Sequence, residues 1–356
     1  MKQNLKIMIA GGCGFVGSSL AHHFIHKYSK SKIYILDNLM RNGSEINLNR
    51  LKNKQIVFIK GDLSQKKFFD NLPPCDIFID AAADPSVLSG INSPILALIR
   101  NNFITTINAL EWCVRTNCKF IFLSSSRVYP IRNLDSIPYF ESETRFEWTE
   151  NTDIEGFSNQ GINEFFDLEG HRSLYGASKF SSELFIQEFG EFKDLKYVIN
   201  RCGMIAGPWQ MGKVDQGIVA YWLSCHIFKK ELKYLGFSGS GKQVRDILHI
   251  YDLCNLIEKQ IVNWSLVDNQ VFNIGGGINN SLSLLELTRL VNRVTGIYLP
   301  ISKDKNQRRA DIRIYLTDNT KIKDTLGWEP SLDTETVISD TFEWIKDHKK
   351  ELRGIF

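Results

Sequence analysis

The stretch "KIMIAGGCGFVGSSL", Lys6–Leu20, joins a short apolar run to a glycine cluster and a helix-like segment. Its glycines Gly11, Gly14 and Gly17 have the spacing G-x-x-G-x-x-G. The first suits a tight turn, the second lets the backbone approach a pyrophosphate, and the third allows close packing of helix on strand. The N-terminus of the helix then faces the phosphate charge. The stretch therefore predicts a dinucleotide-binding turn, although a plain strand-to-helix turn could carry the same glycines.

An acidic residue follows at the expected distance. The next strand-like run, residues 32–38, carries Asp37, 20 residues after Gly17. A carboxylate there accepts hydrogen bonds from ribose hydroxyls and repels a 2′-phosphate, which favours NAD over NADP. Arg41 is a counter-signal, because an arginine can accommodate that phosphate. Asp62, after the third strand, is expected either to meet the adenine amino group or to be a turn residue. The remaining expected cofactor contacts are Phe15, Val16, Asn38, Leu63, Ala81, Ala82, Tyr175 and Lys179.

Apolar runs alternate with helical stretches along the first third of the chain. Runs at 55–62, 75–83 and 119–126 are separated by segments such as "NNFITTINALEWCVRTN", 101–117. Short β-rich runs separated by helices indicate βαβ units and a parallel sheet buried on both faces. Right-handed crossovers then give an α/β fold with a doubly wound parallel sheet, the Rossmann arrangement.

The length predicts more than one compact part. A chain of 356 residues is long for one hydrophobic core, so we expect two domains. The expected nucleotide-binding domain comprises 1–198 and 243–275, and a smaller C-terminal substrate-binding lobe comprises 199–242 and 276–356.

Composition excludes several classes of partner. The net charge of +3 gives no strong basic field, so nucleic acid is not expected. No apolar run reaches the length of a membrane span, and the N-terminus leads directly into the first strand rather than resembling a signal peptide. Seven scattered cysteines without a C-x-x-C pair suggest reduced, mostly buried thiols in a cytoplasmic protein. Cysteines and histidines do not cluster at metal-ligand spacing, so no metal is expected.

The segment "SLYGASK", 173–179, places Tyr175 and Lys179 one helical turn apart. Such a pair could simply be two surface neighbours. A free phenol has a pKa of about 10, and an adjacent ammonium together with a nicotinamide cation favours the phenolate, which can act as a base. The lysine can also hold the cofactor ribose. Ser125 ends the strand "KFIFLSSS", 119–126, at the edge where parallel sheets bind ligands. These three residues are the expected catalytic group.

With these residues in place, the chain resembles the extended short-chain dehydrogenases/reductases that act as nucleotide-sugar epimerases and dehydratases. The resemblance runs nearly end to end and rests on the glycine turn, "SSSRVY", Y-x-x-x-K, "GSGKQVRDILHIYD" (239–252), "VFNIGGG" (271–277) and "LGWEP" (326–330). It implies that Tyr175 is the base, that Lys179 lowers its pKa, and that Ser125 binds the reacting oxygen. It also implies NAD, a nucleotide-diphosphate sugar, and a homodimer or homotetramer formed through helices 101–117 and 175–189.

The same resemblance narrows the reaction. Family 4,6-dehydratases carry an Asp-Glu pair where this chain has Ser126 and Arg127, which disfavours dehydration. Segments 141–148, 161–179, 214–222, 241–249 and 280–287 look like the CDP-paratose (CDP-tyvelose) 2-epimerases of polysaccharide biosynthesis. That branch implies oxidation at C2, rotation of the keto sugar and re-reduction. Met204 and Ala206 depart from the Asn and Tyr of the family pattern. A 4-epimerase, a net dehydrogenase or reductase, and a non-catalytic NAD sensor remain alternatives.

Substrate contacts are expected from the family pattern. Arginine forks suit phosphate oxygens, and Arg245, Arg308 and Arg313 match the family's phosphate or ribose contacts. Arg309 could take the place of Arg308, and an exposed run of arginines is the alternative. Ser125, Ser126 and Gln216 complete the expected substrate set. The long segment 131–172 contains ten acidic and three basic residues. It is interpreted as a wall or lid of the sugar pocket, or otherwise as an acidic surface excursion.

Overall fold

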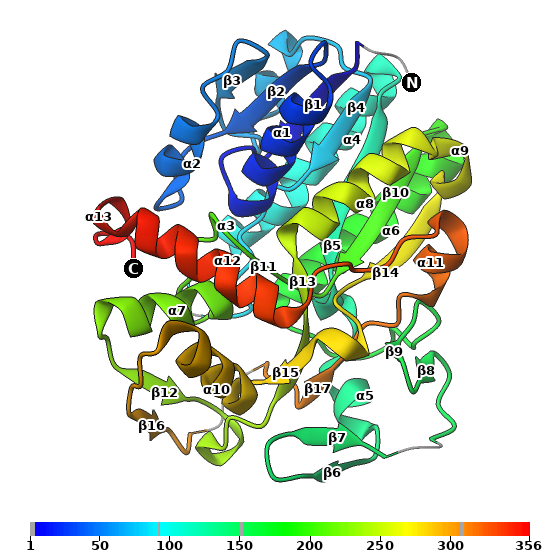
Figure 1. Cartoon of the computed structure of the whole chain (residues 1–356). Helices are drawn as coiled ribbons and strands as arrows, with labels where there is room; N and C mark the ends of the chain where they lie inside the picture. Colours follow the sequence, from blue (N-terminus) through cyan, green and yellow to red (C-terminus); the bar gives the residue numbers. More distant parts are fainter. Residues whose placement is uncertain (1–3, 92, 150–151, 307–309) are drawn as a thin grey trace. The chain divides into compact units, whose positions relative to one another are not determined.

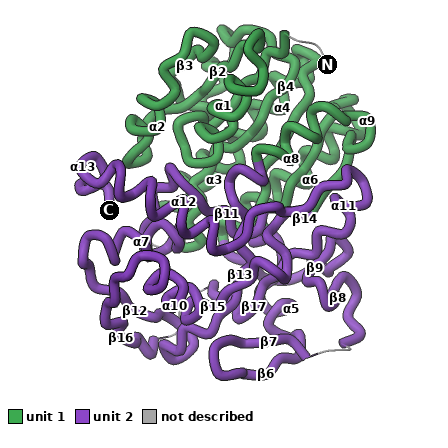
Figure 2. The backbone as a smooth tube through the Cα atoms, in the orientation of Figure 1, with its two compact units in different colours: residues 1–125, 174–201, 254–272 green, residues 126–173, 202–253, 273–356 purple. Residues whose placement is uncertain are grey.

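The computed structural model describes residues 4–91, 93–149, 152–306 and 310–356 and divides the chain into two compact units (Figure 2). The first unit contains 1–125, 174–201 and 254–272, and the second contains 126–173, 202–253 and 273–356. This division differs from the expected boundaries, because 126–173, 243–253 and 273–275 group with the second unit and 199–201 group with the first. The second unit is comparable in length to the first rather than smaller.

A seven-stranded parallel sheet forms the centre of the first unit and confirms the doubly wound fold (Figure 1). The strand order is β14-β10-β5-β4-β1-β2-β3. The order reverses at β1, whose last residue Ala10 pairs with Leu36 of β2 and with Asp80 of β4. The strand bounds are β1 Lys6–Ala10, β2 Lys32–Asp37, β3 Ile56–Lys60, β4 Ile77–Asp80, β5 Lys119–Ser125, β10 Tyr197–Cys202 and β14 Gln270–Ile274. Ligands bind at the carboxyl ends of such strands, beside the reversal.

Helices cover this sheet because its strands are apolar on both faces. On one face, Met8, Phe78 and Phe120 of the strands pack with Trp112 of α4 and Ile186 of α6. The helical elements are α1 Phe15–Lys27, α2 Ser44–Arg50, η1 Lys66–Asn71, α3 Ile95–Ile99, the π-helix η2 Arg100–Ile104, α4 Thr105–Thr116, α6 Leu174–Lys193, α8 Ile250–Val262 and α9 Trp264–Val267. Asn117, with φ of +53°, caps α4 in the left-handed conformation that asparagine tolerates.

The second unit is built around a small mixed sheet. β11 Met204–Ala206 pairs with β13 Val244–His249, which also pairs with β15 Ser281–Ser283 and β17 Ile314–Tyr315. The other strand pairs are β12 Leu232–Tyr234 with β16 Ile301–Lys303, β6 Tyr139–Glu141 with β7 Phe146–Trp148, and β8 Phe157–Ser158 with β9 Gly161–Ile162. The helical elements are η3 Ser126–Val128, α5 Ile131–Ser136, α7 Ile218–Phe228, η4 Phe237–Gly239, η5 Ile278–Asn280, α10 Leu284–Thr295, α11 Thr320–Leu326, α12 Thr334–Asp347 and α13 Lys349–Leu352.

The long segment 131–172 belongs to the second unit because its apolar residues and backbone are bound there. Phe146 is buried against Val244 and Ile314, and its amide donates to the carbonyl oxygen of Lys242 at 2.9 Å. The amide of Ile162 donates to the carbonyl oxygen of Leu316 at 2.8 Å. The domain boundaries expected from the sequence do not reflect these contacts, because the contacts join segments about 100 or more residues apart in the chain.

All seven cysteines are free and buried, as expected. Burial raises the pKa of the Cys75 and Cys113 thiols, which keeps them protonated and poorly reactive. Within the described part of the chain, no helix is long and apolar enough to cross a membrane.

Candidate functional site

The expected catalytic residues all lie in the first unit. Tyr175 and Lys179 are on the first turns of α6 and are only 7% and 2% exposed, so they are not a solvent-exposed surface pair. Lys179 Nζ donates to the carbonyl oxygen of Leu123 at 2.9 Å and lies 4.4 Å from the centre of the Phe122 ring. Leu123 is two residues before Ser125, the buried last residue of β5. The lysine is therefore bound to the strand that ends in the expected catalytic serine.

Asp80, the last residue of β4, is a charged neighbour that the sequence analysis did not single out. Its buried carboxylate accepts from Thr106 Oγ1 at 2.8 Å and from the amide of Ala82 at 3.1 Å. Burial raises the pKa of Asp80, while the positive charge of Lys179 opposes the rise. The signal was available, because an aspartate closes the apolar run "CDIFID".

Asn102 is a second residue that the sequence analysis missed. It lies in the π-helix η2 and is completely buried. Its Oδ1 accepts from the amide of Asp84 at 2.7 Å, and its Nδ2 donates to the carbonyl oxygen of Asp84 at 3.1 Å and to Ser178 Oγ at 3.2 Å. Ser178 precedes Lys179, so Asn102 helps to hold the turn of α6 that carries the lysine. Short π-helical stretches are frequent at functional sites.

The glycine turn has the geometry that its sequence predicts. Gly11 has φ of +67°, and a Cβ there would lie 2.8 Å from the carbonyl oxygen of Ala81. A Cβ on Gly17 would lie 2.2 Å from the carbonyl oxygen of Gly11. The amide of Gly14 donates to that same oxygen at 2.9 Å. Without side chains at these positions the backbone can approach a pyrophosphate, and the turn therefore fits a dinucleotide.

Asp37 is buried directly beside this turn. Its Oδ2 accepts from the amide of Cys13 at 2.9 Å, and its Oδ1 accepts from the amide of Leu39 at 2.8 Å. These bonds fix the carboxylate and leave further lone pairs on both oxygens. Asp62 accepts from the amide of Ser64 at 2.9 Å, which is a turn contact. The other expected cofactor residues lie in the first turn of α1 (Phe15, Val16), after β2 (Asn38), after β3 (Leu63) and after β4 (Ala81, Ala82).

In the second unit, two of the expected arginines are engaged with protein groups. Arg245 lies 3.2 Å from Asp311 Oδ1 and donates to the carbonyl oxygen of Ile312 at 2.7 Å. Arg313 lies 3.4 Å from Asp135 Oδ2, and its guanidinium carbon is 4.9 Å and 5.2 Å from the centres of the Tyr139 and Phe237 rings. Arg308 lies outside the described residues.

Three smaller features of the second unit concern the expected substrate contacts. Ser126 begins η3, and Arg127 in the same turn donates to the carbonyl oxygen of Ala310 at 3.1 Å. Gln216 Oε1 is buried and has no hydrogen-bond partner among the described residues, so it can accept a hydrogen bond from a ligand.

In the described ranges 4–91, 93–149, 152–306 and 310–356, no group of three or more His, Cys, Asp or Glu side chains could hold a metal ion.

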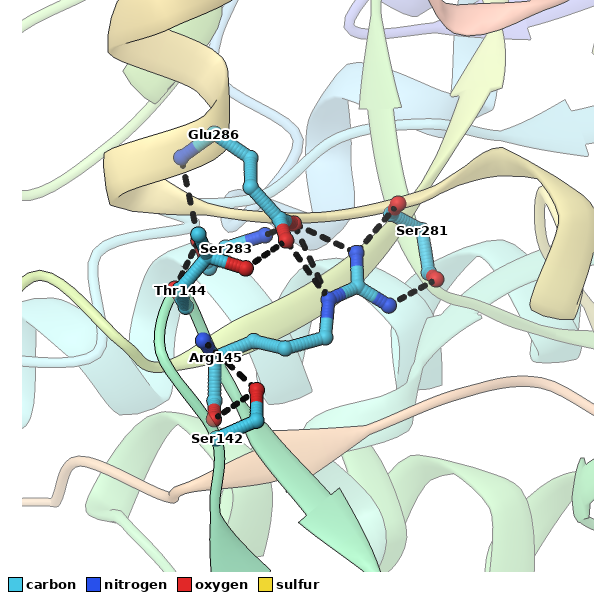
Figure 3. A network of polar contacts seen from close by, with 6 residues as sticks. All are labelled: Ser142, Thr144, Arg145, Ser281, Ser283 and Glu286. Carbon is cyan, nitrogen blue, oxygen red and sulfur yellow. Dashed lines mark hydrogen bonds and ion pairs between the residues drawn. The ribbon is translucent and has the colours of Figure 1, made fainter.

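The hairpin β6–β7 in the segment 131–172 is fixed by a polar network (Figure 3). Arg145 Nε lies 3.0 Å from both oxygens of Glu286, and its Nη2 lies 2.5 Å from Oε2. Arg145 also donates to the hydroxyl and carbonyl oxygens of Ser281 at 3.1 and 2.9 Å. Thr144 Oγ1 donates to Glu286 Oε1 at 2.6 Å. These contacts fix the turn of the hairpin to the start of α10.

Glu286 has a second role in the same network. It is the N3 residue of a capping box at the start of α10, where its amide and carboxylate exchange hydrogen bonds with Ser283 at 3.0 and 2.9 Å. Burial opposes ionisation of Glu286, but the hydrogen bonds from Arg145, Ser283 and Thr144 outweigh it and lower its pKa.

Comparisons with known proteins agree with this geometry. Residues 7–275 match the family described as the NAD dependent epimerase/dehydratase family. The chain is 30% identical to the CDP-paratose 2-epimerase of Salmonella typhi over 96% of this chain and 99% of that protein. It is 24% identical to the dTDP-glucose 4,6-dehydratase of Streptomyces antibioticus over 97% of this chain and 93% of that protein.

A solved structure shows the same fold. The UDP-glucuronic acid 4-epimerase of Bacillus cereus, in complex with UDP-glucuronic acid and NAD, superposes with a TM-score of 0.79 at 21% identity. The superposition covers 96% of this chain and 99% of that one.

Proposed function

Because this chain belongs to the NAD dependent epimerase/dehydratase family, we propose that it epimerises C2 of a CDP-linked sugar, by oxidation to a keto sugar and re-reduction. The observation that carries the proposal is the buried set of Tyr175, Lys179 and Ser125, in a chain similar over nearly its whole length to a CDP-paratose 2-epimerase. Polysaccharide biosynthesis is the setting that such a reaction fits.

Each residue of this set has a task in the proposed reaction. Bound NAD supplies the hydride acceptor and donor. Tyr175 Oη takes the proton of the reacting sugar hydroxyl and later returns it. Lys179 stabilises the phenolate and holds the nicotinamide ribose, and the Ser125 hydroxyl hydrogen-bonds the reacting oxygen. Burial of all three excludes water, which protects the keto sugar from side reactions.

The glycine turn and Asp37 support the choice of cofactor. In the proposed complex the pyrophosphate lies on the turn at Gly11, Gly14 and Gly17, and Asp37 accepts hydrogen bonds from the adenosine ribose. Phe15, Val16, Asn38, Asp62, Leu63, Ala81 and Ala82 complete the proposed contacts.

The pairing of arginine with phosphate supports the proposed substrate contacts. Arg245, Arg308 and Arg313 neutralise the diphosphate, and Ser126 and Gln216 contact the sugar or base. Arg245 and Arg313 already have carboxylate partners, Asp311 and Asp135, so each would share its guanidinium between that carboxylate and a phosphate.

Dehydration is the less favoured chemistry, because Ser126 and Arg127 replace the acidic pair expected of a dehydratase and neither can serve as a carboxylate acid or base. Epimerisation at C4 is the second candidate. It uses the same three residues and differs only in which sugar hydroxyl is presented to Tyr175.

A homodimer is part of the proposal. The expected interface helices, 101–117 and 175–189, correspond to η2 with α4 and to α6, and Phe103 of η2 packs edge to face with Phe185 of α6 at 5.4 Å. Apolar side chains of α6 and of α3, which directly precedes η2, are exposed in the single chain. The exposed members are Ile95, Leu96, Leu184, Phe185 and Phe192. A second copy would cover this surface. The reduced, buried thiols fit a cytoplasmic location.

Isotope tracing tests the proposed reaction. A CDP-6-deoxyhexose or CDP-3,6-dideoxyhexose deuterated at C2 should give the C2 epimer with its deuterium retained, without added NAD and without accumulating NADH. The same reaction in heavy water should add no label at C2, because Tyr175 handles only the hydroxyl proton.

Each other outcome has a defined meaning. Loss of label to solvent would mean carbanion chemistry, and inversion at C4 would select the second candidate. Turnover of UDP-, GDP- or dTDP-sugars alone would support the proposed mechanism and reject the proposal that the substrate is a CDP-sugar. Accumulation of NADH would indicate a net dehydrogenase. If no nucleotide sugar were turned over but NAD still bound, a sensor role would remain.

A further inference from the structure

A buried ion pair joins α6 to strand β10 in the first unit. Arg201 of β10 places Nε 3.0 Å and Nη2 2.8 Å from Oε2 of Glu183 on α6. The other carboxylate oxygen, Oε1, accepts a hydrogen bond from the hydroxyl of Ser124. The side chains of Arg201 and Glu183 are 5% and 0% exposed. Both oxygens of the carboxylate therefore have donors, far from water.

The position of Glu183 links this pair to the expected catalytic residues. It lies one helical turn after Lys179 and two turns after Tyr175, so the three side chains follow one stripe of α6. On the strand, Ser124 lies between Leu123, whose carbonyl binds Lys179, and Ser125. The side chains of Lys179 and Glu183 are thus hydrogen-bonded to Leu123 and Ser124, the two residues of β5 that precede Ser125.

The four charges of this region alternate in sign. Asp80 ends β4, Lys179 and Glu183 lie on α6, and Arg201 lies in β10. The strands β4, β5 and β10 are neighbours in the sheet, and all four side chains are buried. Replacing a buried ion pair by apolar residues is often neutral or stabilising, so its presence is weak support for a stability role. A role in geometry is the better account.

We propose that Glu183, held by Arg201 and Ser124, is a positioning residue that fixes Ser125 relative to Tyr175 and Lys179. It does not touch the substrate. Its carboxylate fixes the position of α6 along the direction of β5. The distance of the Ser125 hydroxyl from the Tyr175 phenol and the Lys179 ammonium depends on that position. Hydrogen-bond and proton-transfer catalysis depends on placement within fractions of an ångström. This inference rests on the proposed function only in that these three residues perform the chemistry.

The variant Ser124→Ala tests the proposal with little risk to folding, because it removes one hydrogen bond and leaves the ion pair. We expect kcat to fall about 10- to 100-fold while KM stays within about 2-fold. A second readout needs no substrate. The ultraviolet titration of Tyr175, obtained as the difference between each protein and its Tyr175→Phe counterpart, should move to higher pH, since the displaced Lys179 stabilises the phenolate less.

Gln260→Leu is the matched control. Gln260 and Asn200 exchange hydrogen bonds at 3.0 and 2.7 Å, both side chains are buried, and Asn200 adjoins Arg201 on β10. Successive residues of a strand face opposite sides of the sheet, so this pair lies away from Glu183. Gln260→Leu should lower the melting temperature but leave kcat and the Tyr175 titration unchanged.

The proposal is overturned if Ser124→Ala retains both the wild-type kcat and the wild-type titration, or if both variants lose activity in proportion to their loss of stability. Arg201→Lys keeps the charge but loses the guanidinium fork, and it should shift kcat and the titration in the same direction as Ser124→Ala. If wild-type protein is inactive on CDP-sugars while Ser124→Ala still shifts the Tyr175 titration, the proposed substrate is rejected and the positioning role of Glu183 is supported.

Discussion

Lys179 donates a hydrogen bond to the carbonyl oxygen of Leu123 at 2.9 Å. An ammonium that is 2% exposed and bonded to strand β5 has little freedom to reorient. Since Ser125 follows on the same strand, the helix that carries Tyr175 and the strand that carries the serine are held together by the lysine itself. This hydrogen bond therefore holds α6 to β5 beside the expected catalytic residues.

Tyr175→Phe should abolish most catalysis, because only the phenolic oxygen is removed. We expect kcat to fall at least about 100-fold, with the dissociation constant of NAD changed less than about 2-fold. Stopped-flow or coupled assays with the proposed sugar nucleotide, together with calorimetry for NAD, measure the two quantities. Tyr298→Phe changes a tyrosine that is 75% exposed and serves as the control. An unchanged kcat in Tyr175→Phe would remove the tyrosine from the mechanism.

Asp37→Ser should weaken NAD about 10-fold and relax discrimination against NADP, through loss of the ribose contact and of a negative charge. Calorimetric titration with each cofactor measures both effects. Asp70→Ser, at an exposed aspartate paired loosely with Arg115 at 3.7 Å, should leave both affinities unchanged. Equal NAD affinity in Asp37→Ser and wild-type protein would show that Asp37 does not bind the ribose.

Gly17→Ala should destabilise the first unit and weaken NAD. The added Cβ would lie 2.2 Å from the carbonyl oxygen of Gly11, a backbone atom that cannot move aside cheaply. We expect a loss of about 1 to 3 kcal/mol in the free energy of unfolding. Gly354→Ala is the control, since nothing lies within 4 Å of a Cβ there. Wild-type stability and NAD affinity in Gly17→Ala would contradict the close approach of helix and turn.

Glu286→Gln should destabilise the protein in a pH-dependent way. The folded-state pKa of Glu286 lies below its unfolded value of about 4.3. Its charge therefore contributes stability above that value, and the contribution is lost as pH falls through the folded-state pKa. At pH 7 we expect a loss of about 2 kcal/mol, since hydrogen bonds to a charged group are removed.

Urea unfolding at pH 7, pH 5 and pH 3.5 measures this effect. The difference between wild-type protein and Glu286→Gln should be largest at pH 7 and should shrink at the lowest pH. Glu335→Gln breaks another Arg–Glu pair, with Arg293 at 2.7 Å, but both of these side chains are more than half exposed. It should change stability by less than about 0.5 kcal/mol. A pH-independent loss in Glu286→Gln would show that the carboxylate charge is not what stabilises the hairpin.

Phe185→Glu should convert the proposed dimer to a monomer, because a charge would be buried in the apolar surface of α3 and α6. Size-exclusion chromatography with light scattering gives the mass directly. Phe165→Glu, in the second unit at a position 76% exposed, should leave the mass unchanged. Wild-type protein that is monomeric at micromolar concentration, or a dimeric Phe185→Glu, would reject this interface.

The sequence predicts those parts of the fold and site whose signals are local. The turn at Gly11, Gly14 and Gly17 and the strand that ends at Asp37 are sequence-contiguous, and the structure places them as expected. Likewise, the spacing of Tyr175 and Lys179 is set by one helix. These features depend on backbone periodicity and on the absence of side chains, both of which can be read from neighbouring residues.

The remaining features depend on contacts between distant segments. Glu183 and Arg201 pair across a helix and a strand, and no local pattern shows that a polar residue inside α6 meets an arginine of β10. The contact of Asn102 with Ser178 could not be predicted from the sequence, because it depends on the π-helix in which Asn102 lies. The grouping of 131–172 with the second unit depends on contacts such as Phe146 with Ile314. Periodicity predicts elements, but not which elements share a core.

The clamp between Arg145 and Glu286 couples two positions that are 141 residues apart in the chain. Glu286 completes the capping box of α10 and anchors the hairpin with the same carboxylate, so a change at Glu286 affects both elements. A chimaera whose imported hairpin 139–148 lacked an arginine at position 145 would leave an unmatched carboxylate at the start of α10. Recombination of these proteins should therefore succeed when 139–148 and 281–286 are exchanged as one module.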